Sequence, residues 1–171
     1  MPDKNLEHLL KLYNPWWENP HGPWRKGLPD YRRPVVQEIL ADLKDLPQMV
    51  SITGPRRVGK TTSQKQVICT LLDEQGVAPR QILYFSFDDP EVFGSTELQR
   101  IIFDRLVERI GATPDDGSQW YFFLDEIQRL PKWELYLKKY YDLKFPIRFI
   151  VSGSASSAIF RNSQESLLGR I

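Results

Sequence analysis

Short apolar runs alternate along this chain with longer segments in which apolar residues recur every three or four positions. The first kind of segment is typical of strands buried on both faces, and the second of amphipathic helices. Strands that alternate with helices in this way predict a mainly parallel sheet covered by helices on both faces. The predicted strands are residues 49–53, 81–87, 120–124 and 147–151, and the predicted helices are residues 34–46, residues 62–75, the segment that carries Leu98 to Ile110, and the segment that carries Trp133 to Tyr140.

The first 30 residues do not share this pattern. Apolar residues up to Tyr13 predict a short amphipathic helix that ends at Asn14-Pro15. The following stretch is crowded with proline and glycine, which argues against a regular element, and it carries tryptophans that are costly to expose to water. We therefore expect residues 1–30 to form a helix and an irregular segment that packs on a core of residues 31–171, with a partner-binding surface as the alternative. The tryptophans are Trp16, Trp17 and Trp24.

Composition narrows the class of protein without identifying it. The chain has 171 residues, which fits one ordinary domain, and a formal net charge of +1, so no overall basic field points to nucleic acid. Its single cysteine, Cys69, excludes a disulfide within the chain. The amino terminus lacks an apolar signal core and no apolar run is long enough to cross a bilayer, so we expect a cytoplasmic protein without a membrane partner.

The strongest motif lies between the first predicted strand and the helix after it. Residues 54–61 match G-x-x-x-x-G-K-[ST], in which backbone N–H groups of a tight turn wrap phosphates and glycines let the main chain approach them. Lys60 would place its ammonium between the β- and γ-phosphates, and the Thr61 hydroxyl would bind Mg²⁺. We therefore predict a phosphate-binding loop (Walker A motif) for a nucleoside triphosphate, with a ligand-free glycine turn as the alternative. The predicted nucleotide-binding residues are Gly54, Pro55, Arg56, Arg57, Val58, Gly59, Lys60, Thr61 and Thr62.

A second motif supplies two carboxylates at the end of a later buried strand. Asp125 and Glu126 follow four apolar residues, and α/β sheets bind ligands at the carboxyl ends of their strands. This arrangement predicts a Walker B motif in which Asp125 holds Mg²⁺ together with Thr61, and Glu126 orients or deprotonates the attacking water. A solvated turn is the alternative. The adjacent glutamate favours a hydrolase, and the sequence has no segment of the type that reads guanine, so ATP is preferred over GTP.

Two serines follow the fourth predicted strand. The hydroxyl of Ser152 or Ser154 could lie between the Walker B carboxylates and the γ-phosphate and respond to its loss after hydrolysis. A strand-ending turn with a serine that caps residues 155–160 explains the same residues equally well. Both interpretations stay open at this point.

Five segments together resemble a family of bacterial and archaeal AAA-like ATPases, from about residue 30 to the end. This resemblance implies a P-loop NTPase fold of three α/β/α layers, with the additional strand of AAA-like cores, followed by a fifth strand and a C-terminal domain. Because the chain ends at Ile171, we expect a truncated core that lacks its last strand. The segments are residues 54–62, Leu124-Asp125-Glu126-Ile127-Gln128, Pro131 with Trp133, Ser152-Gly153-Ser154, and Leu168-Gly169-Arg170.

The resemblance also implies roles for residues outside the two main motifs. Arg170 is a candidate arginine finger, whose charge reaches a γ-phosphate in its own site or in a neighbour's. Residues 31–33 occupy a place where related ATPases contact adenine or its surroundings, with surface packing as the alternative. Asp88 and Asp89 end the second predicted strand, at the edge of the sheet where the two motifs are expected.

We expect a solvated turn at Asp88-Asp89, with contact to Mg²⁺, water or a partner as the alternative.

Three functions are consistent with these motifs. The first is an ATPase that binds and hydrolyses Mg-ATP and passes the cycle to a partner protein or to a missing C-terminal domain. The second is a nucleotide-dependent switch with negligible turnover, in which the tryptophan-rich segment contacts the partner. The third is a DNA-associated ATPase, although clustered basic residues usually form a solvated face. The basic residues concerned are Arg25, Lys26, Arg32, Arg33, Lys138 and Lys139.

Overall fold

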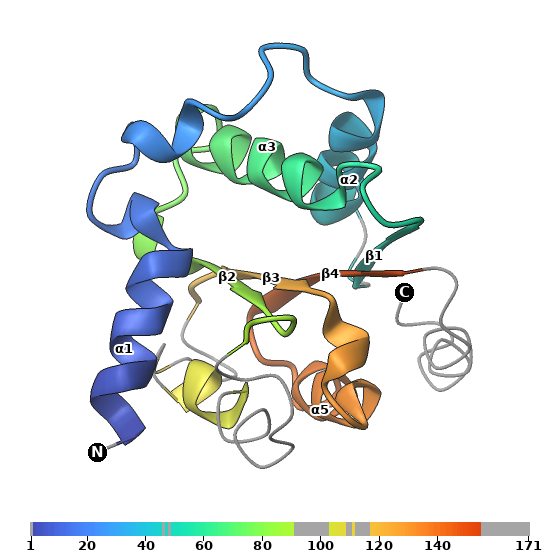
Figure 1. The fold of residues 1–171 in the computed structure, drawn as a ribbon. Coiled ribbons are helices and arrows are strands. Elements are labelled where there is room, and N and C mark those ends of the chain that lie inside the picture. Colours follow the sequence, from blue (N-terminus) through green and yellow to red (C-terminus); the bar gives the residue numbers. More distant parts are fainter. Residues whose placement is uncertain are drawn as a thin grey trace.

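The computed structural model describes residues 2–45, 47, 49–90, 103–108, 111 and 117–154, with side chains from residue 7 onward. Four strands form one sheet in the order β1-β4-β3-β2, and all neighbouring strands are parallel (Figure 1). Most residues of these strands are buried, as expected where helices cover both faces. The predicted parallel sheet is thus confirmed. The strands are β1 (Val50–Gly54), β2 (Ile82–Ser86), β3 (Trp120–Asp125) and β4 (Ile147–Ser154).

Helices lie on both faces of the sheet, so the fold has the three predicted α/β/α layers (Figure 1). On one face lie α2 (Pro34–Asp45) and α3 (Lys60–Asp73). On the other face lie α5 (Trp133–Asp142) and the helical residues 103–108. A further helix, α1 (Pro2–Tyr13), runs beside β2. Short 3-10 helices connect these elements: η1 (Pro15–Trp17), η2 (Pro23–Arg25), η3 (Pro79–Gln81) and η4 (Ile127–Arg129).

Each face of the sheet carries its own apolar cluster, because successive side chains of a strand point to opposite faces. Phe123 and Ile150 belong to the cluster beneath α2 and α3. Their neighbours Phe122 and Phe149 belong to the cluster that faces α5. The nearly continuous apolar runs in the sequence are therefore explained by burial on both sides.

The segment after α1 covers the outer edge of β2. The side-chain amide of Asn14 accepts a hydrogen bond from the N–H of Tyr84 over 2.6 Å and donates one to the carbonyl of Tyr84 over 3.0 Å, so it pairs with the strand as a neighbouring strand would. Trp16 and Trp17 both donate from Nε1 to the carbonyl of Ile82. Trp16 is fully buried. The stretch was expected to lack regular elements, but its prolines begin the two 3-10 turns η1 and η2.

Within the described residues, β1 pairs with β4 and with no other strand. The expected absence of a fifth strand concerns residues beyond Ser154, which lie outside the described residues, so that expectation stays a prediction. The division into residues 1–30 and 31–171 also stays a prediction. No helix in the described part of the chain combines the length and the apolar character needed to cross a membrane.

Candidate functional site

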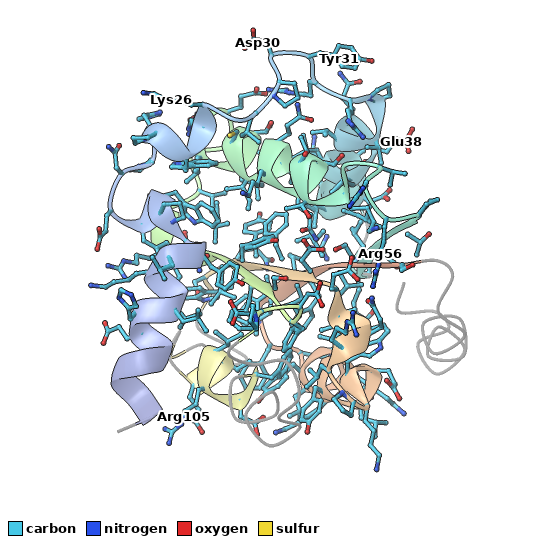
Figure 2. All side chains as sticks on the ribbon, in the orientation of Figure 1. Lys26, Asp30, Tyr31, Glu38, Arg56 and Arg105 are labelled. Atoms are coloured by element: carbon cyan, nitrogen blue, oxygen red, sulfur yellow. The ribbon has the colours of Figure 1, made fainter. Side chains whose placement is uncertain are left out.

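The phosphate-binding loop connects β1 to α3 at the carboxyl end of the sheet. Two of its residues have left-handed backbone conformations, Arg57 with φ 64° and Gly59 with φ 88°. Left-handed residues in such a turn aim successive N–H groups toward one point, which creates a binding place for an anion. Arg56 lies at this end of the sheet, near the end of β1 (Figure 2). The loop leads directly into α3, whose first residue is Lys60.

The ammonium of Lys60 lies across this loop. Its Nζ donates to the carbonyls of Gly54 over 3.1 Å and Pro55 over 3.0 Å, and the residue is only 7% exposed. Both partners are neutral carbonyls, so the positive charge is held at the loop without a carboxylate in these two bonds. A charge placed in this way suits a phosphate ligand.

Asp125 is the centre of a network of four hydrogen bonds at the end of β3. The Thr61 hydroxyl donates to its Oδ2 over 2.6 Å, and the Tyr84 hydroxyl donates to the same oxygen over 2.8 Å. The other oxygen, Oδ1, accepts bonds from the backbone N–H of Glu126 over 3.1 Å and from the hydroxyl of Ser152. The structure therefore joins the two predicted motifs, because Thr61 of one bonds Asp125 of the other.

Thr61 and Asp125 fit a magnesium ion in the chemistry of their donor atoms. Both present oxygen, and Mg²⁺ is usually held by one or two such side chains together with phosphates and water. The described residues contain no cluster of three or more His, Cys, Asp or Glu that could form an all-protein metal cage. A metal at this place would be held by Thr61 and Asp125 together with phosphate oxygens or water.

Glu126 has a strained backbone and a restrained side chain. Its φ of 50° and ψ of 41° lie in the left-handed region, which is uncommon for residues other than glycine and is often found at functional sites. Its Oε2 accepts a hydrogen bond of 2.5 Å from the amide of Gln128. Glu126 is thus fixed beside Asp125, with its carboxylate turned to Gln128.

The two candidate serines differ in their positions. β4 continues through Ser154, so Ser152 lies within a strand and not in a turn. A serine cap of residues 155–160 concerns residues outside the described part of the chain and stays a prediction. Ser152 lies next to β3 and donates to Asp125, as a residue close to the Walker B carboxylate would. Ser154 is opposite Gly54 in the register of β1 with β4. Arg170 lies outside the described residues, and so its role stays a prediction.

The Asp88-Asp89 turn is not fully solvated, contrary to expectation. Asp89 is only 8% exposed and accepts a hydrogen bond of 2.6 Å from the hydroxyl of Tyr13. Asp88 lies 3.2 Å from Nε of Arg129. The carboxylate of Asp89 is thus buried by the helix that precedes the tryptophan-rich segment.

Two tyrosine hydroxyls near the site have a raised pKa. Burial raises the pKa of Tyr84 well above its ordinary value, and the charge of Asp125 adds to the effect. Burial also raises the pKa of Tyr13, with a further contribution from its bond to Asp89. Both side chains therefore donate hydrogen bonds to carboxylates at neutral pH.

Among residues 31–33, only Arg33 reaches the phosphate-binding loop. Its guanidinium donates to the carbonyl of Val58, and a Cβ atom placed on Gly59 would lie 2.6 Å from its Nη2. Arg32 instead forms an ion pair of 2.6 Å with Glu74, and Tyr31 is 69% exposed. The predicted contact of residues 31–33 with adenine or its surroundings stays a prediction.

The basic residues considered for DNA do not form one surface. Arg25 makes a two-point ion pair with Asp73, with distances of 2.5 and 2.9 Å, and Arg32 is paired as described above. Lys26 lies on the side of α3 that faces away from the sheet (Figure 2), whereas Lys138 belongs to α5 on the opposite face of the sheet. Lys139 also belongs to α5.

Residues 46–171 match the family model described as an AAA domain, and this match covers more than half of the chain. The chain belongs to this family. Membership confirms the predicted AAA-like P-loop ATPase family and, with the parallel sheet, its α/β/α fold. It also supports nucleotide binding by this AAA domain.

One solved structure with a similar fold is that of PCH-2 from C. elegans. The TM-score is 0.47 at 13% sequence identity, and the match covers 79% of the present chain and 35% of the PCH-2 chain. The chain thus spans about a third of that protein. No curated protein matches the chain.

Tyr84 and Asn14 are site residues that the motifs did not reveal. Tyr84 lies on β2, 41 positions from Asp125, and Asn14 lies between α1 and η1, 70 positions from Tyr84. The local signal was the hydroxyl of Tyr84 within a largely apolar strand. Its meaning depends on the pairing of β2 with β3, which no single segment encodes.

Proposed function

We propose that this AAA domain binds Mg-ATP at residues 54–62 and hydrolyses it. The observation that carries the proposal is the 2.6 Å hydrogen bond between Thr61 and Asp125, because it brings the phosphate-binding loop and the Walker B carboxylate into one site. Mg²⁺, when bound, would neutralise charge on the phosphate oxygens. The site itself supplies the groups that bind and orient ATP.

Each predicted residue has a defined task in this proposal. Backbone N–H groups of the loop and the ammonium of Lys60 bind the phosphates, and Thr61 with Asp125 holds the metal. Glu126 orients or deprotonates the attacking water. Ser152 is the better sensor candidate, since it contacts Asp125, while Ser154 is a second candidate beside Gly54. Arg170 would act as an arginine finger.

ATP is the proposed nucleotide, and the cycle would act on a partner protein or on a further C-terminal domain. A cytoplasmic location is part of the same proposal. A DNA-associated role finds little support in the distribution of basic residues, because Arg25 and Arg32 are engaged in ion pairs.

A nucleotide-dependent switch without turnover is the second candidate function. It is favoured by the 2.5 Å bond that turns the Glu126 carboxylate toward Gln128. This bond engages Oε2 of Glu126, so only Oε1 is left to accept a proton from water.

Phosphate release from ATP by the Glu126→Gln variant distinguishes the two functions. If Glu126 is the general base, its substitution should lower the rate by about 100-fold or more. Glu134→Gln, which changes a carboxylate in the first turn of α5 that belongs to neither motif, is the matched control and should leave the rate unchanged. Tight ATP binding with no phosphate release by the wild type would favour the switch instead.

A further inference from the structure

The carboxylate of Asp125 is held by a tyrosine that belongs to neither motif. Tyr84 lies on β2 and donates to Oδ2 of Asp125 over 2.8 Å. In the pairing of β2 with β3, Tyr84 is opposite Phe123, two positions before Asp125, so these side chains leave the sheet on the same face. The contact is therefore set by the register of the sheet.

Tyr84 has little freedom to move away from this position. It is 4% exposed, and both hydrogen-bonding groups of its main chain are engaged by the amide of Asn14. Its ring packs against that of Tyr13, with a distance of 5.9 Å between the ring centroids. Since backbone and ring are both fixed, the direction of the hydroxyl is fixed as well.

The other donors to Asp125 do not duplicate this contact. Ser152 and the N–H of Glu126 hold Oδ1, so Oδ2 is left to Tyr84 and Thr61. Thr61 is the hydroxyl that the proposed function assigns to the metal. Without Tyr84, the position of Oδ2 would depend on Thr61 alone.

We propose that Tyr84 is a positioning residue for the magnesium site, because its hydroxyl fixes the rotation of the Asp125 carboxylate. The proposal rests on the proposed function, from which Asp125 takes its role as a metal-binding group. Asn14, which precedes the region matched by the family model, acts on the site through Tyr84. Partners that orient a metal ligand typically change metal affinity 10- to 100-fold when they are removed.

Magnesium titrations of nucleotide binding test this role in Tyr84→Phe, which loses only the hydroxyl. A fluorescent ADP analogue is held below saturation while Mg²⁺ is varied, and the half-saturating Mg²⁺ concentration should rise about tenfold. Affinity for the analogue in EDTA should stay unchanged. Tyr121→Phe is the matched control. Tyr121 lies on β3 opposite Ile82, two positions before the pair of Tyr84 with Phe123, and its side chain leaves the sheet on the same face. Its half-saturating concentration should equal that of the wild type.

Two outcomes would overturn the role of Tyr84, and they differ in what they say of the proposed function. An unchanged half-saturating Mg²⁺ concentration in folded Tyr84→Phe, with a wild type that responds to Mg²⁺, would overturn the positioning role alone. A wild type that binds no nucleotide at any Mg²⁺ concentration would overturn both.

If Tyr84→Phe does not fold, wild-type protein labelled with ¹³Cζ-tyrosine answers the same question. The signals of the six other tyrosines are assigned with single Tyr→Phe variants, so that the remaining signal is that of Tyr84; these are Tyr13, Tyr31, Tyr121, Tyr136, Tyr140 and Tyr141. The Tyr84 signal should shift when Mg²⁺ is added to the ADP-bound protein. No shift of the Tyr84 signal would overturn the role.

Discussion

At the residue scale, Gly59 is required for two separate reasons. Its φ of 88° is strained for any residue with a Cβ atom, and that atom would meet the guanidinium of Arg33 at 2.6 Å. The guanidinium is the end of a flexible side chain and can move, whereas the backbone conformation belongs to the loop itself. Backbone strain of about 1–2 kcal/mol should therefore dominate over the contact with Arg33.

Gly59→Ala should lower the free energy of unfolding by about 1–3 kcal/mol and weaken nucleotide binding, because the N–H groups of the loop lose their arrangement. Urea unfolding and equilibrium binding measure the two effects. Gly76→Ala is the control, since Gly76 has φ 65° with nothing within 4 Å of a Cβ atom, and it should lose stability while binding is kept. Full recovery of stability on adding Arg33→Ala would show that the contact, not the backbone, is decisive.

The buried Tyr84 and the half-buried Tyr13 predict a loss of stability at alkaline pH. Burial, together with their carboxylate partners, raises the pKa of each in the folded state above the unfolded value of about 10. Their contribution to stability is therefore complete below about pH 10 and is lost as the pH rises through the folded pKa. Urea unfolding at pH 8 to 12 should show this decline, and the Tyr13→Phe, Tyr84→Phe double variant should decline less steeply. Equal slopes in both proteins would contradict the assignment.

At the element scale, the edge of β2 is closed by a side chain rather than by a strand. Asn14 is fully buried, and its amide satisfies both the N–H and the carbonyl of Tyr84. Trp16 and Trp17 both donate hydrogen bonds to the carbonyl of Ile82, further along the same edge. A sheet edge that is left open invites pairing with other chains, so this segment protects the fold as well as the site.

Asn14→Ala should lower the free energy of unfolding by about 2–4 kcal/mol, because it leaves two buried backbone groups without partners. Asn19→Ala, at an exposed position of the same segment, should change it by less than about 0.5 kcal/mol. Chemical unfolding of the two variants makes the comparison. Equal small losses would mean that water replaces the Asn14 amide and that the segment does not close the edge.

The elements themselves were largely predictable, while their long-range contacts were not. Strand and helix periods placed all four described strands and the start of α3 within a few residues, because local burial patterns encode them. The predicted end of the fourth strand was three residues short, because the Ser-Gly-Ser sequence of residues 152–154 has no apolar side chain and is kept in a strand by pairing with β1. Asn14 could not be identified, because its partner Tyr84 is defined only by the folded chain.

At the scale of the whole molecule, the strand order explains why one site forms. With β4 and β3 in adjacent central positions and β1 and β2 outside them, the carboxyl ends of all four strands meet along one edge. Thr61 after β1, Tyr84 on β2, Ser152 on β4 and Asp125 on β3 converge there. The two motifs predicted the phosphate- and metal-binding groups of this edge from the sequence. The order of the strands then brings Tyr84 to the same place.

Equilibrium binding of Mg-ATP to the wild type, Lys60→Ala and Lys65→Ala tests the central claim most directly. Lys60 bonds two carbonyls of the loop, whereas Lys65 lies one turn further along the same helix. The wild type and Lys65→Ala should bind with equal affinity, and Lys60→Ala should bind about 10- to 100-fold more weakly, because it loses a charge-assisted contact to phosphate. Equal affinity in all three proteins, or no binding in any of them, would contradict the account.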